Sequence, residues 1–261
     1  PADPSVGVLM GVNAFNDVTA DHIVATRRIA HATTLVANAV IERKGALTAL
    51  LTTKGFRDVL ELRRHVRVTT YELWADPPEP LVPRWLRLPI NERVFSDGNV
   101  LKEVESSDVT EVVPLLKAEG VTSVAISFLH SYANADNERK VSELLKNLIP
   151  DVAVTCSHEV LPQIKEYERT STTVVNAYVK PLTRTYLANL EKGLVEKGYS
   201  APLNIMLSNG GLGSIATAAE FPIRLIESGP VAGAIVGREL AMVLGHADVL
   251  SFDMGGTTAK A

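Results

Sequence analysis

The feature that most constrains this chain is the way glycine and proline divide it into short segments that alternate in hydrophobic period. The runs 121–129, which is apolar and β-branched in character, and 203–207 have the length of strands. Stretches such as 134–148 and 230–244 have helical character instead. Strands that alternate with helices predict an α/β fold.

The same reasoning predicts the other elements, and two prolines modify them. Pro114 is expected to kink or shorten a helix over 108–119, and Pro181 to break a helical stretch over 164–197. Residues 66–90 hold five prolines and both tryptophans, and they predict an irregular arm. The remaining expected elements are helices at 4–12, at 33–44 and from 55, strands at 23–30, 47–52, 152–156, 223–227 and 248–253, and a hairpin over 92–104 that turns at Asp97-Gly98.

Composition excludes several classes of protein. With 46% apolar and 21% charged residues, the chain is expected to fold around a core, and a net charge of −4 argues against a general nucleic-acid binder. No apolar run is long enough to span a membrane, and the N-terminus does not resemble a signal peptide. The single cysteine, Cys156, excludes an intramolecular disulfide, predicts a buried structural thiol and fits a cytoplasmic protein. The ends, Pro1 and Ala261, do not look like natural domain edges, so we expect a fragment of a longer chain.

The most informative motif is the run from Val249 to Thr258, in which an apolar strand leads into Asp253, two glycines and two threonines. Glycines allow a tight turn whose N–H groups approach an anion, and threonine hydroxyls can donate to phosphate oxygens. An acid at the end of a strand can hold hydrated Mg²⁺ or orient a nucleophile. The alternative is an ordinary hairpin turn.

Two further glycine-rich loops follow predicted strands. The run from Glu227 to Gly233 opens a helix with Pro230 near its first position, and its free N–H groups could bind an anion or its glycines could serve packing only. The loop Ser208-Asn209-Gly210-Gly211 ends another strand, where open α/β sheets usually bind ligands, although it could also be a plain surface turn.

Two polar patches remain open to two interpretations each. His31, close to Thr33, is either a buried, hydrogen-bonded histidine or a substrate contact. The run 166–173 is either a solvated helix start or the wall of a site in which Arg169 binds a carboxylate or phosphate. His130 and His158 do not form a metal-ligand spacing with Cys156.

Taken together, these motifs resemble the hydantoinase A/5-oxoprolinase family, which also includes acetone and acetophenone carboxylase subunits. They occur in order over nearly the whole chain, and their joint occurrence is far more specific than any one of them. The stretches that carry the resemblance are His31–Ala46, Leu51–Glu61, Leu129–Asn134, Glu166–Tyr178, Ser208–Gly211, Glu227–Gly233 and Phe252–Thr258.

The resemblance implies ribonuclease-H-like lobes of the actin, sugar kinase and heat-shock ATPase superfamily, here as an incomplete fragment. It also implies an N-terminal region over 1–162 and the start of a central ATPase domain over 163–261. The chain departs from the family in two places. Ala32 stands where the family usually has glycine, and Thr258-Ala259-Lys260 stands where many members have Ser-Thr-Asp, which leaves the branch of the family open.

The function that the resemblance implies is ATP-dependent hydrolysis of a cyclic amide, with the carbonyl activated by phosphorylation. The alternatives are a subunit of an acetone- or acetophenone-type carboxylase and a non-enzymatic, actin-like nucleotide-binding module. The expected cofactors are ATP and Mg²⁺, and the expected partners are a small cyclic amide or ketone and a second, unrelated subunit of the hydantoinase B type.

The site residues that we expect fall into three groups. Asp253 and Thr257 are expected to be catalytic, with Asp253 also holding the metal. His31, Thr33 and Arg169 are the substrate-side candidates. The nucleotide is expected to contact Gly255, Gly256, Thr257, Thr258, Ser208, Asn209, Gly210, Gly229 and Gly233.

Overall fold

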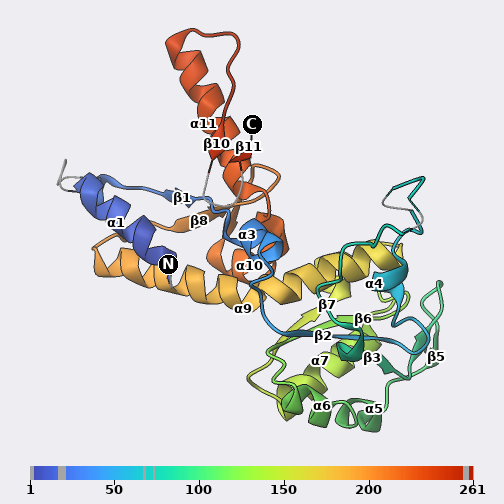
Figure 1. Ribbon diagram of the computed structural model, residues 1–261. Coiled ribbons are helices and arrows are strands. Elements are labelled where there is room, and N and C mark those ends of the chain that lie inside the picture. The colour runs from blue at the N-terminus through green and yellow to red at the C-terminus, as the bar shows by residue number, and fades with distance from the viewer. Residues whose placement is uncertain (1–2, 17–21, 67–68, 73, 255–258, 261) are drawn as a thin grey trace. The chain divides into compact units, whose positions relative to one another are not determined.

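The computed structural model describes residues 3–16, 22–66, 69–72, 74–254 and 259–260. The chain divides into two compact units (Figure 1). The central unit is Gly45–Pro181, and the split unit combines Pro1–Lys44 with Leu182–Ala261. Both units mix helices with strands, so the predicted α/β class is confirmed.

A four-stranded, wholly parallel sheet forms the middle of the central unit. Its order is β3 (Arg87–Ile90), β2 (Thr48–Thr53), β6 (Ser123–Ser127) and β7 (Ala153–Cys156). Every residue of β2 and β6 is buried. Such strands need cover on both faces, because a parallel sheet buries both.

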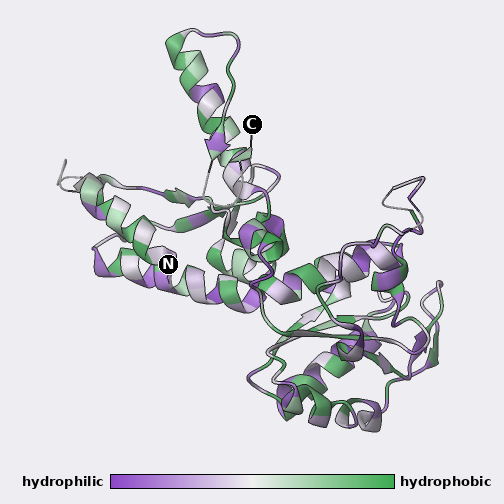
Figure 2. Ribbon diagram, in the orientation of Figure 1, coloured by the Kyte–Doolittle hydropathy of each residue, from purple (hydrophilic) through white to green (hydrophobic). Residues whose placement is uncertain are grey.

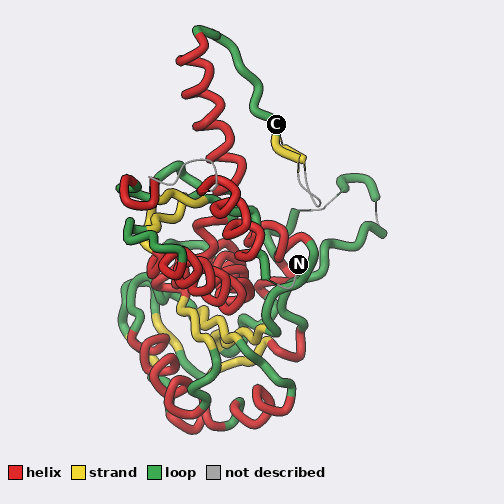
Figure 3. Tube along the Cα trace, turned by 90° about the vertical axis from the view of Figure 1, so that its left-hand side faces the viewer, coloured by secondary structure: helices red, strands yellow, loops and turns green. Residues whose placement is uncertain are grey.

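Helices supply that cover (Figures 1 and 3). On one face lie α5 (Ser106–Thr110), α6 (Val113–Ala118) and α7 (Asp136–Leu148), and on the other lies the first half of α9 (Glu166–Glu196). The hydrophobic core joins Leu50, Leu51 and Ile126 of the sheet to helix residues such as Leu145 and Val174. The other elements of this unit are α4 (Val59–Leu62), the 3₁₀ helix η1 (Arg84–Leu86), the hairpin β4 (Arg93–Val94) and β5 (Val100–Lys102), and α8 (Ser157–Val160).

Helix α9 does not break at Pro181, contrary to the sequence-based prediction, and runs on to Glu196. Proline has no N–H to donate to the carbonyl four residues earlier. That carbonyl, on Ala177, instead accepts a hydrogen bond from the Ser123 hydroxyl at 2.7 Å. The next carbonyl, on Tyr178, accepts from the N–H of Ala46 at 2.8 Å. The Ser123 hydroxyl thus replaces the donor that Pro181 lacks, and the N–H of Ala46 adds a second bond to the helix.

The split unit contains a small mixed sheet. Strand β1 (Ile29–His31) runs parallel to β8 (Leu203–Met206), which runs antiparallel to β9 (Leu212–Ser214). The other elements are α1 (Ser5–Asn16), α2 (His22–Ala25), α3 (Leu35–Ile41), the second half of α9, α10 (Ile215–Glu220), the 3₁₀ helix η2 (Pro222–Leu225), α11 (Ser228–Leu244) and the short pair β10 (Asp253–Met254) and β11 (Ala259–Lys260).

Hydrophobic residues recur along α11 (Figure 2), and several of them, including Val236, Leu240 and Val243, are exposed. Of the helices that the structure describes, none combines the length and the apolar character that crossing a bilayer requires.

Four other sequence-based predictions were wrong in part or in full. The expected strand 23–30 is helical over His22–Ala25 and pairs with β8 only from Ile29 onward. The expected strand 223–227 is a 3₁₀ helix, because Pro222 stands at its first turn and favours helical φ. Of the expected strand 248–253, only Asp253 is paired.

The fourth error concerns the arm over 66–90, which ends in a real strand, β3. A strand that contains Pro89 is tolerated because β3 lies at the edge of the sheet. An edge strand has a neighbour on one side only, so the N–H that proline lacks need not be paired with a second strand. The break at Pro114 is confirmed as the gap between α5 and α6, and Gly120 has the positive φ of +69° that suits the end of a helix.

We expect Ser123→Ala to lower the free energy of unfolding by about 1–2 kcal/mol, because it leaves the Ala177 carbonyl without a donor. In a Pro181→Ala background the new N–H can serve that carbonyl, so the same substitution should have a smaller effect. Urea unfolding of the four proteins of this double-mutant cycle measures the difference, with exposed Thr122→Ala as the control. Equal effects in both backgrounds would contradict the proposed role of the hydroxyl.

Candidate functional site

The loops that the sequence singles out converge where the parallel strands β1 and β8 end. The turn after β1 contacts the start of α11: the Ser228 hydroxyl donates to the Thr33 carbonyl at 3.0 Å. A Cβ on Gly229 would lie only 2.7 Å from Cγ2 of Thr34, so a larger residue there would force the helix away from the turn. The carboxyl end of a parallel strand and the N-terminus of a long helix thus meet in the split unit.

The loop after β8 joins the same group. The Ser208 hydroxyl donates to the Arg224 carbonyl at 2.8 Å and accepts from the Glu227 N–H at 3.1 Å. Asn209 accepts from the Gly211 N–H at 3.0 Å, and Gly210 has a φ of +82° that favours glycine. Ser208 therefore ties its loop to the residues that lead into α11.

Asp253 lies on β10 and faces the start of α11 across a hollow of about 400 Å³. Gly233 lies beside the same segment, since a Cβ on it would be 3.3 Å from the Ser251 hydroxyl oxygen. Among the described residues the Asp253 carboxylate has no hydrogen-bond or ion-pair partner. Its oxygens are thus free for a hard cation such as Mg²⁺, which suits that chemistry. The other lining residues are Glu227, Pro230, Val231, Ala234, Val249, Leu250 and Ser251.

The predicted phosphate turn itself, Gly255, Gly256, Thr257 and Thr258, lies outside the described residues. Its contacts with a nucleotide stay a prediction.

His31 is a hydrogen-bonded histidine, the first of its two interpretations. Its Nε2 lies 2.7 Å from the Tyr186 hydroxyl of α9, and burial lowers the pKa of His31. A neutral imidazole can accept the tyrosine proton at that distance. The Thr33 hydroxyl, two residues further along the chain, accepts from the Leu35 N–H at 3.1 Å. A substrate role for His31 or Thr33 stays a prediction.

Arg169 belongs to the central unit, where it is buried and only 1% exposed. Its guanidinium donates to the Gln163 carbonyl at 2.7 Å and to the Phe128 carbonyl at 3.1 Å, and it lies 5.3 Å from the centre of the Tyr132 ring. These contacts attach α9 to the loop that follows β6. Its predicted contact with substrate stays a prediction.

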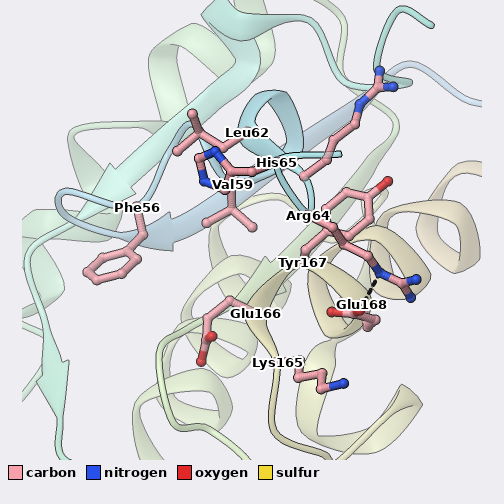
Figure 4. Close-up of a pocket in the computed structure, with 10 residues that line it drawn as sticks. Phe56, Val59, Leu62, Arg64, His65, Lys165, Glu166, Tyr167 and Glu168 are labelled. Carbon is pink, nitrogen blue, oxygen red and sulfur yellow. Dashed lines mark hydrogen bonds and ion pairs between the residues drawn. The ribbon is translucent and has the colours of Figure 1, made fainter. Parts of the chain in front are cut away.

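The rest of the run 166–173 separates into two environments. Glu166, Tyr167 and Glu168 line a hollow of about 630 Å³ together with Phe56, Val59 and residues 62–65 (Figure 4). Arg64 donates to Glu168 at 2.6 Å across this hollow. Thr170 and Thr173, by contrast, are buried. At the start of α9, residues 166–168 therefore line a surface hollow, whereas Thr170 and Thr173 lie inside the protein.

Glu138, which was not among the residues predicted from the sequence, is a buried polar residue of the central unit with several hydrogen bonds. Its side chain is fully buried at 0% exposure, and its two oxygens accept four hydrogen bonds. Oε1 accepts from the Phe128 N–H at 2.9 Å and the Ser157 hydroxyl at 2.6 Å. Oε2 accepts from the backbone N–H of His158 at 3.0 Å and from its Nδ1 at 2.7 Å.

The signal for Glu138 was present in the sequence. Glu138, Val141, Ser142 and Leu145 follow the i, i+3, i+4, i+7 spacing of a buried helix face, and all four are buried. A carboxylate at the first position of such a stripe needs partners inside the protein.

Glu138, Cys156 and His158 place ligand atoms within 4.8 Å of one another, which is close enough for a metal ion. Burial and nearby acids raise the pKa of the Cys156 thiol, so it is protonated and a poor ligand. The Glu138 oxygens are already used by four donors. The three residues therefore form a structural network, and the prediction of a buried structural thiol is confirmed.

The structure thus defines an α/β protein with glycine loops and an acid gathered at the end of a parallel strand pair, which is the usual setting of a ligand site in such folds. Residues 1–149 match the family model described as hydantoinase/oxoprolinase N-terminal region, and residues 169–261 match the one described as hydantoinase/oxoprolinase. The chain belongs to the hydantoinase/oxoprolinase family.

Individual relatives agree with this assignment. The caprolactamase subunit alpha of Pseudomonas jessenii is 37% identical over 87% of this chain and 33% of its own length. The acetophenone carboxylase gamma subunit of Aromatoleum aromaticum is 30% identical over 99% of this chain and 37% of its own. The crystal structure of the ATP-dependent caprolactamase from Pseudomonas jessenii matches with a TM-score of 0.85 and 34% identity, over 99% of this chain and 38% of that one. The chain thus spans 33–38% of the length of these relatives.

We expect the stability contributed by His31 to depend on pH. Because burial lowers its folded-state pKa below the ordinary value of 6.5, the unfolded chain binds more protons as the pH falls below 6.5. The free energy of unfolding should therefore fall with pH in this range, and His31→Gln should reduce the slope. Urea unfolding at several pH values tests this, with exposed His246→Gln as the control. An unchanged slope in His31→Gln would contradict the argument.

A second prediction concerns Glu138. Glu138→Gln replaces an oxygen acceptor by an NH₂ group that faces two donors, and it should lower the free energy of unfolding by about 2–4 kcal/mol. Glu143→Gln, at an exposed position of the same helix, is the matched control and should change stability little. Thermal and urea unfolding measure both. Equal stability of the two variants would show that the buried carboxylate is not required.

Proposed function

We propose that this chain is part of an ATP-dependent hydrolase that opens a cyclic amide after activating its carbonyl by phosphorylation. The observation that carries the proposal is the convergence of Thr33, Ser208, Gly229 and Asp253 around the end of the β1–β8 pair and the start of α11. Relatives whose names describe ATP-dependent caprolactam chemistry support it.

In this proposal, the backbone N–H groups of Gly255 and Gly256 and the hydroxyls of Thr257 and Thr258 bind phosphate oxygens. Asp253 holds Mg²⁺, whose charge offsets that of the phosphates. Ser208, Asn209, Gly210, Gly229 and Gly233 line the cleft, and Thr257 assists the transfer.

The chemistry needs fixed donors and a dry site. The amide oxygen of the substrate takes the γ-phosphoryl group, which makes the carbonyl carbon electrophilic, and water then opens the ring with loss of phosphate. N–H groups held in advance around the phosphates stabilise the charge that develops. His31, Thr33 and Arg169 are proposed on the substrate side.

The fold proposal is that the split unit contributes to ribonuclease-H-like lobes of the actin and sugar kinase superfamily. The mixed sheet β1-β8-β9 supports this. The division at 162–163 is proposed as the boundary between the N-terminal region and the ATPase domain. A second subunit of unrelated sequence is proposed as the partner, since several relatives are named as subunits.

A carboxylase subunit is the second candidate, because the acetophenone carboxylase gamma subunit aligns over 99% of this chain. In this second proposal, the same phosphate-binding residues would serve the phosphorylation of a ketone enolate and of bicarbonate. A non-enzymatic nucleotide-binding module would bind the nucleotide without a small-molecule response.

The test is phosphate release from Mg²⁺-ATP by the full-length protein with its partner subunit. We expect stimulation by caprolactam, hydantoin or 5-oxoproline without bicarbonate. Stimulation only by a ketone with bicarbonate would replace the hydrolase by the carboxylase, and no stimulation would favour the non-enzymatic module.

Asp253→Asn should reduce this phosphate release at least a hundredfold, since neutralising the residue removes the ligand for Mg²⁺. Exposed Asp248→Asn, five residues earlier on the same segment, is the matched control and should keep full activity. Circular dichroism should show both variants folded. Normal turnover by folded Asp253→Asn would overturn the assignment of this carboxylate.

A further inference from the structure

A polar hollow of about 390 Å³ lies in the central unit, beyond the ends of β6 and β7. None of its lining residues takes part in the nucleotide site proposed above. The polar residues that line it are Ser131, Tyr132, Asn134, Asp136, Arg139 and His158.

His158 presents one defined atom to this hollow. Its Nδ1 is bound to Glu138 at 2.7 Å, and its backbone N–H donates to the same oxygen. The side chain is 11% exposed. Nε2 is the ring nitrogen that remains without a partner among the described residues. The carboxylate therefore fixes both the orientation of the ring and the proton on Nδ1.

The hydroxyls nearby have fixed directions as well. Ser157 gives its proton to Glu138, so Ser131, 2.8 Å away, must donate to the Ser157 oxygen. Both serine protons are thus used on the side of Glu138. Neither serine can donate to a molecule in the hollow, which leaves His158 as the donor from this network.

His158 faces the buried carboxylate of Glu138 on one side and the hollow on the other. Glu138 is fully buried, and His158 is its one ion-pair partner in the described part of the chain. A buried carboxylate stabilises an adjacent imidazolium, because an uncompensated buried charge is costly. A proton that the ring takes up together with an anion would sit on Nε2, because Nδ1 is bound to Glu138.

We propose that this hollow binds a small oxyanion, a carboxylate or a phosphate, whose oxygen accepts a hydrogen bond from Nε2–H of His158. Arg139 supplies a positive charge at the rim of the hollow. Its ion pair with Asp136, at 3.0 Å, partly offsets that charge. The titratable and charged groups around the ring are Glu138, Asp136 and Arg139 of α7, Cys156 of β7, Glu159 of α8, Arg169 of α9, and His130 and Tyr132 of the loop after β6.

Nitrogen-15 NMR of the histidine rings tests the proposal in the full-length protein. The chain has six histidines, and the loss of one signal in a His158 variant assigns the ring. The probes are inorganic phosphate and acetate, each titrated at constant ionic strength against chloride. We expect a saturable shift of the His158 Nε2 signal, with a larger response below the histidine titration range than above it.

The two probes identify the source of the oxyanion: a tighter response to phosphate indicates a phosphate ligand, and a tighter response to acetate a carboxylate. A shift that chloride reproduces, or none with either probe, would overturn the proposal. Phosphate bound only at the nucleotide site would leave the His158 signal in place, so the two proposals fail separately.

His158→Asn is the decisive variant. The asparagine NH₂ can still donate to Glu138 in place of Nδ1, while the atom that faces the hollow is lost. We expect the affinity for the anion, measured by calorimetry, to weaken roughly ten- to a hundredfold. His65→Asn, at an exposed histidine of the same unit, should bind as the unmodified protein does. Equal affinity in both variants would overturn the proposal, and if His158→Asn does not fold, the ring spectra alone decide.

Discussion

One buried carboxylate organises the carboxyl edge of the central sheet. Parallel strands end with their last N–H and C=O groups at the same edge, and those groups need partners once the edge is covered. Glu138 reaches this edge from α7 and accepts from the backbone after β6 and from both side chain and backbone after β7. Arg169 then bonds the carbonyl of Phe128, whose N–H Glu138 has taken. The loop after β6 is thereby held from both faces of the sheet.

The sequence predicted most of the central unit because its signals are local. Buried strands such as β2 and β6, the hairpin at Asp97-Gly98 and the paired helices around Pro114 each follow from residues close together in the chain. The errors came where distant partners decide. Pro181 alone predicts a break, yet α9 continues because Ser123 and Ala46 supply donors from elsewhere in the unit. Pro89 predicts no strand, yet its place at a sheet edge permits one.

The candidate site divides in the same way. The glycine loops and Asp253 were found because glycine and acidic residues after apolar strands carry a local signal. Their contacts could not be predicted, since the Ser208 bond to Arg224 and the fit of Gly229 against Thr34 depend on tertiary packing. Glu138 was missed because a buried helix face is a common feature of any core, and its partner His158 lies twenty residues away in the sequence. Family membership supports the proposed nucleotide site, whereas the polar hollow beside His158 is visible only in the structure.

The contact between Ala46 and Tyr178 also has a topological meaning. The chain enters the central unit near Ala46 and leaves it shortly after Tyr178, and the N–H of Ala46 donates to the Tyr178 carbonyl at 2.8 Å. A side chain at Gly45 would collide with the Tyr178 ring, so the two ends of the segment lie close together. A segment whose two ends meet in this way can be inserted into a host chain without stretching it. In the sequence, the central unit is thus an insertion into the split unit, with one crossing before Gly45 and the other within α9. Evolution could elaborate the insertion while the host fold keeps the pairing of β1 with β8.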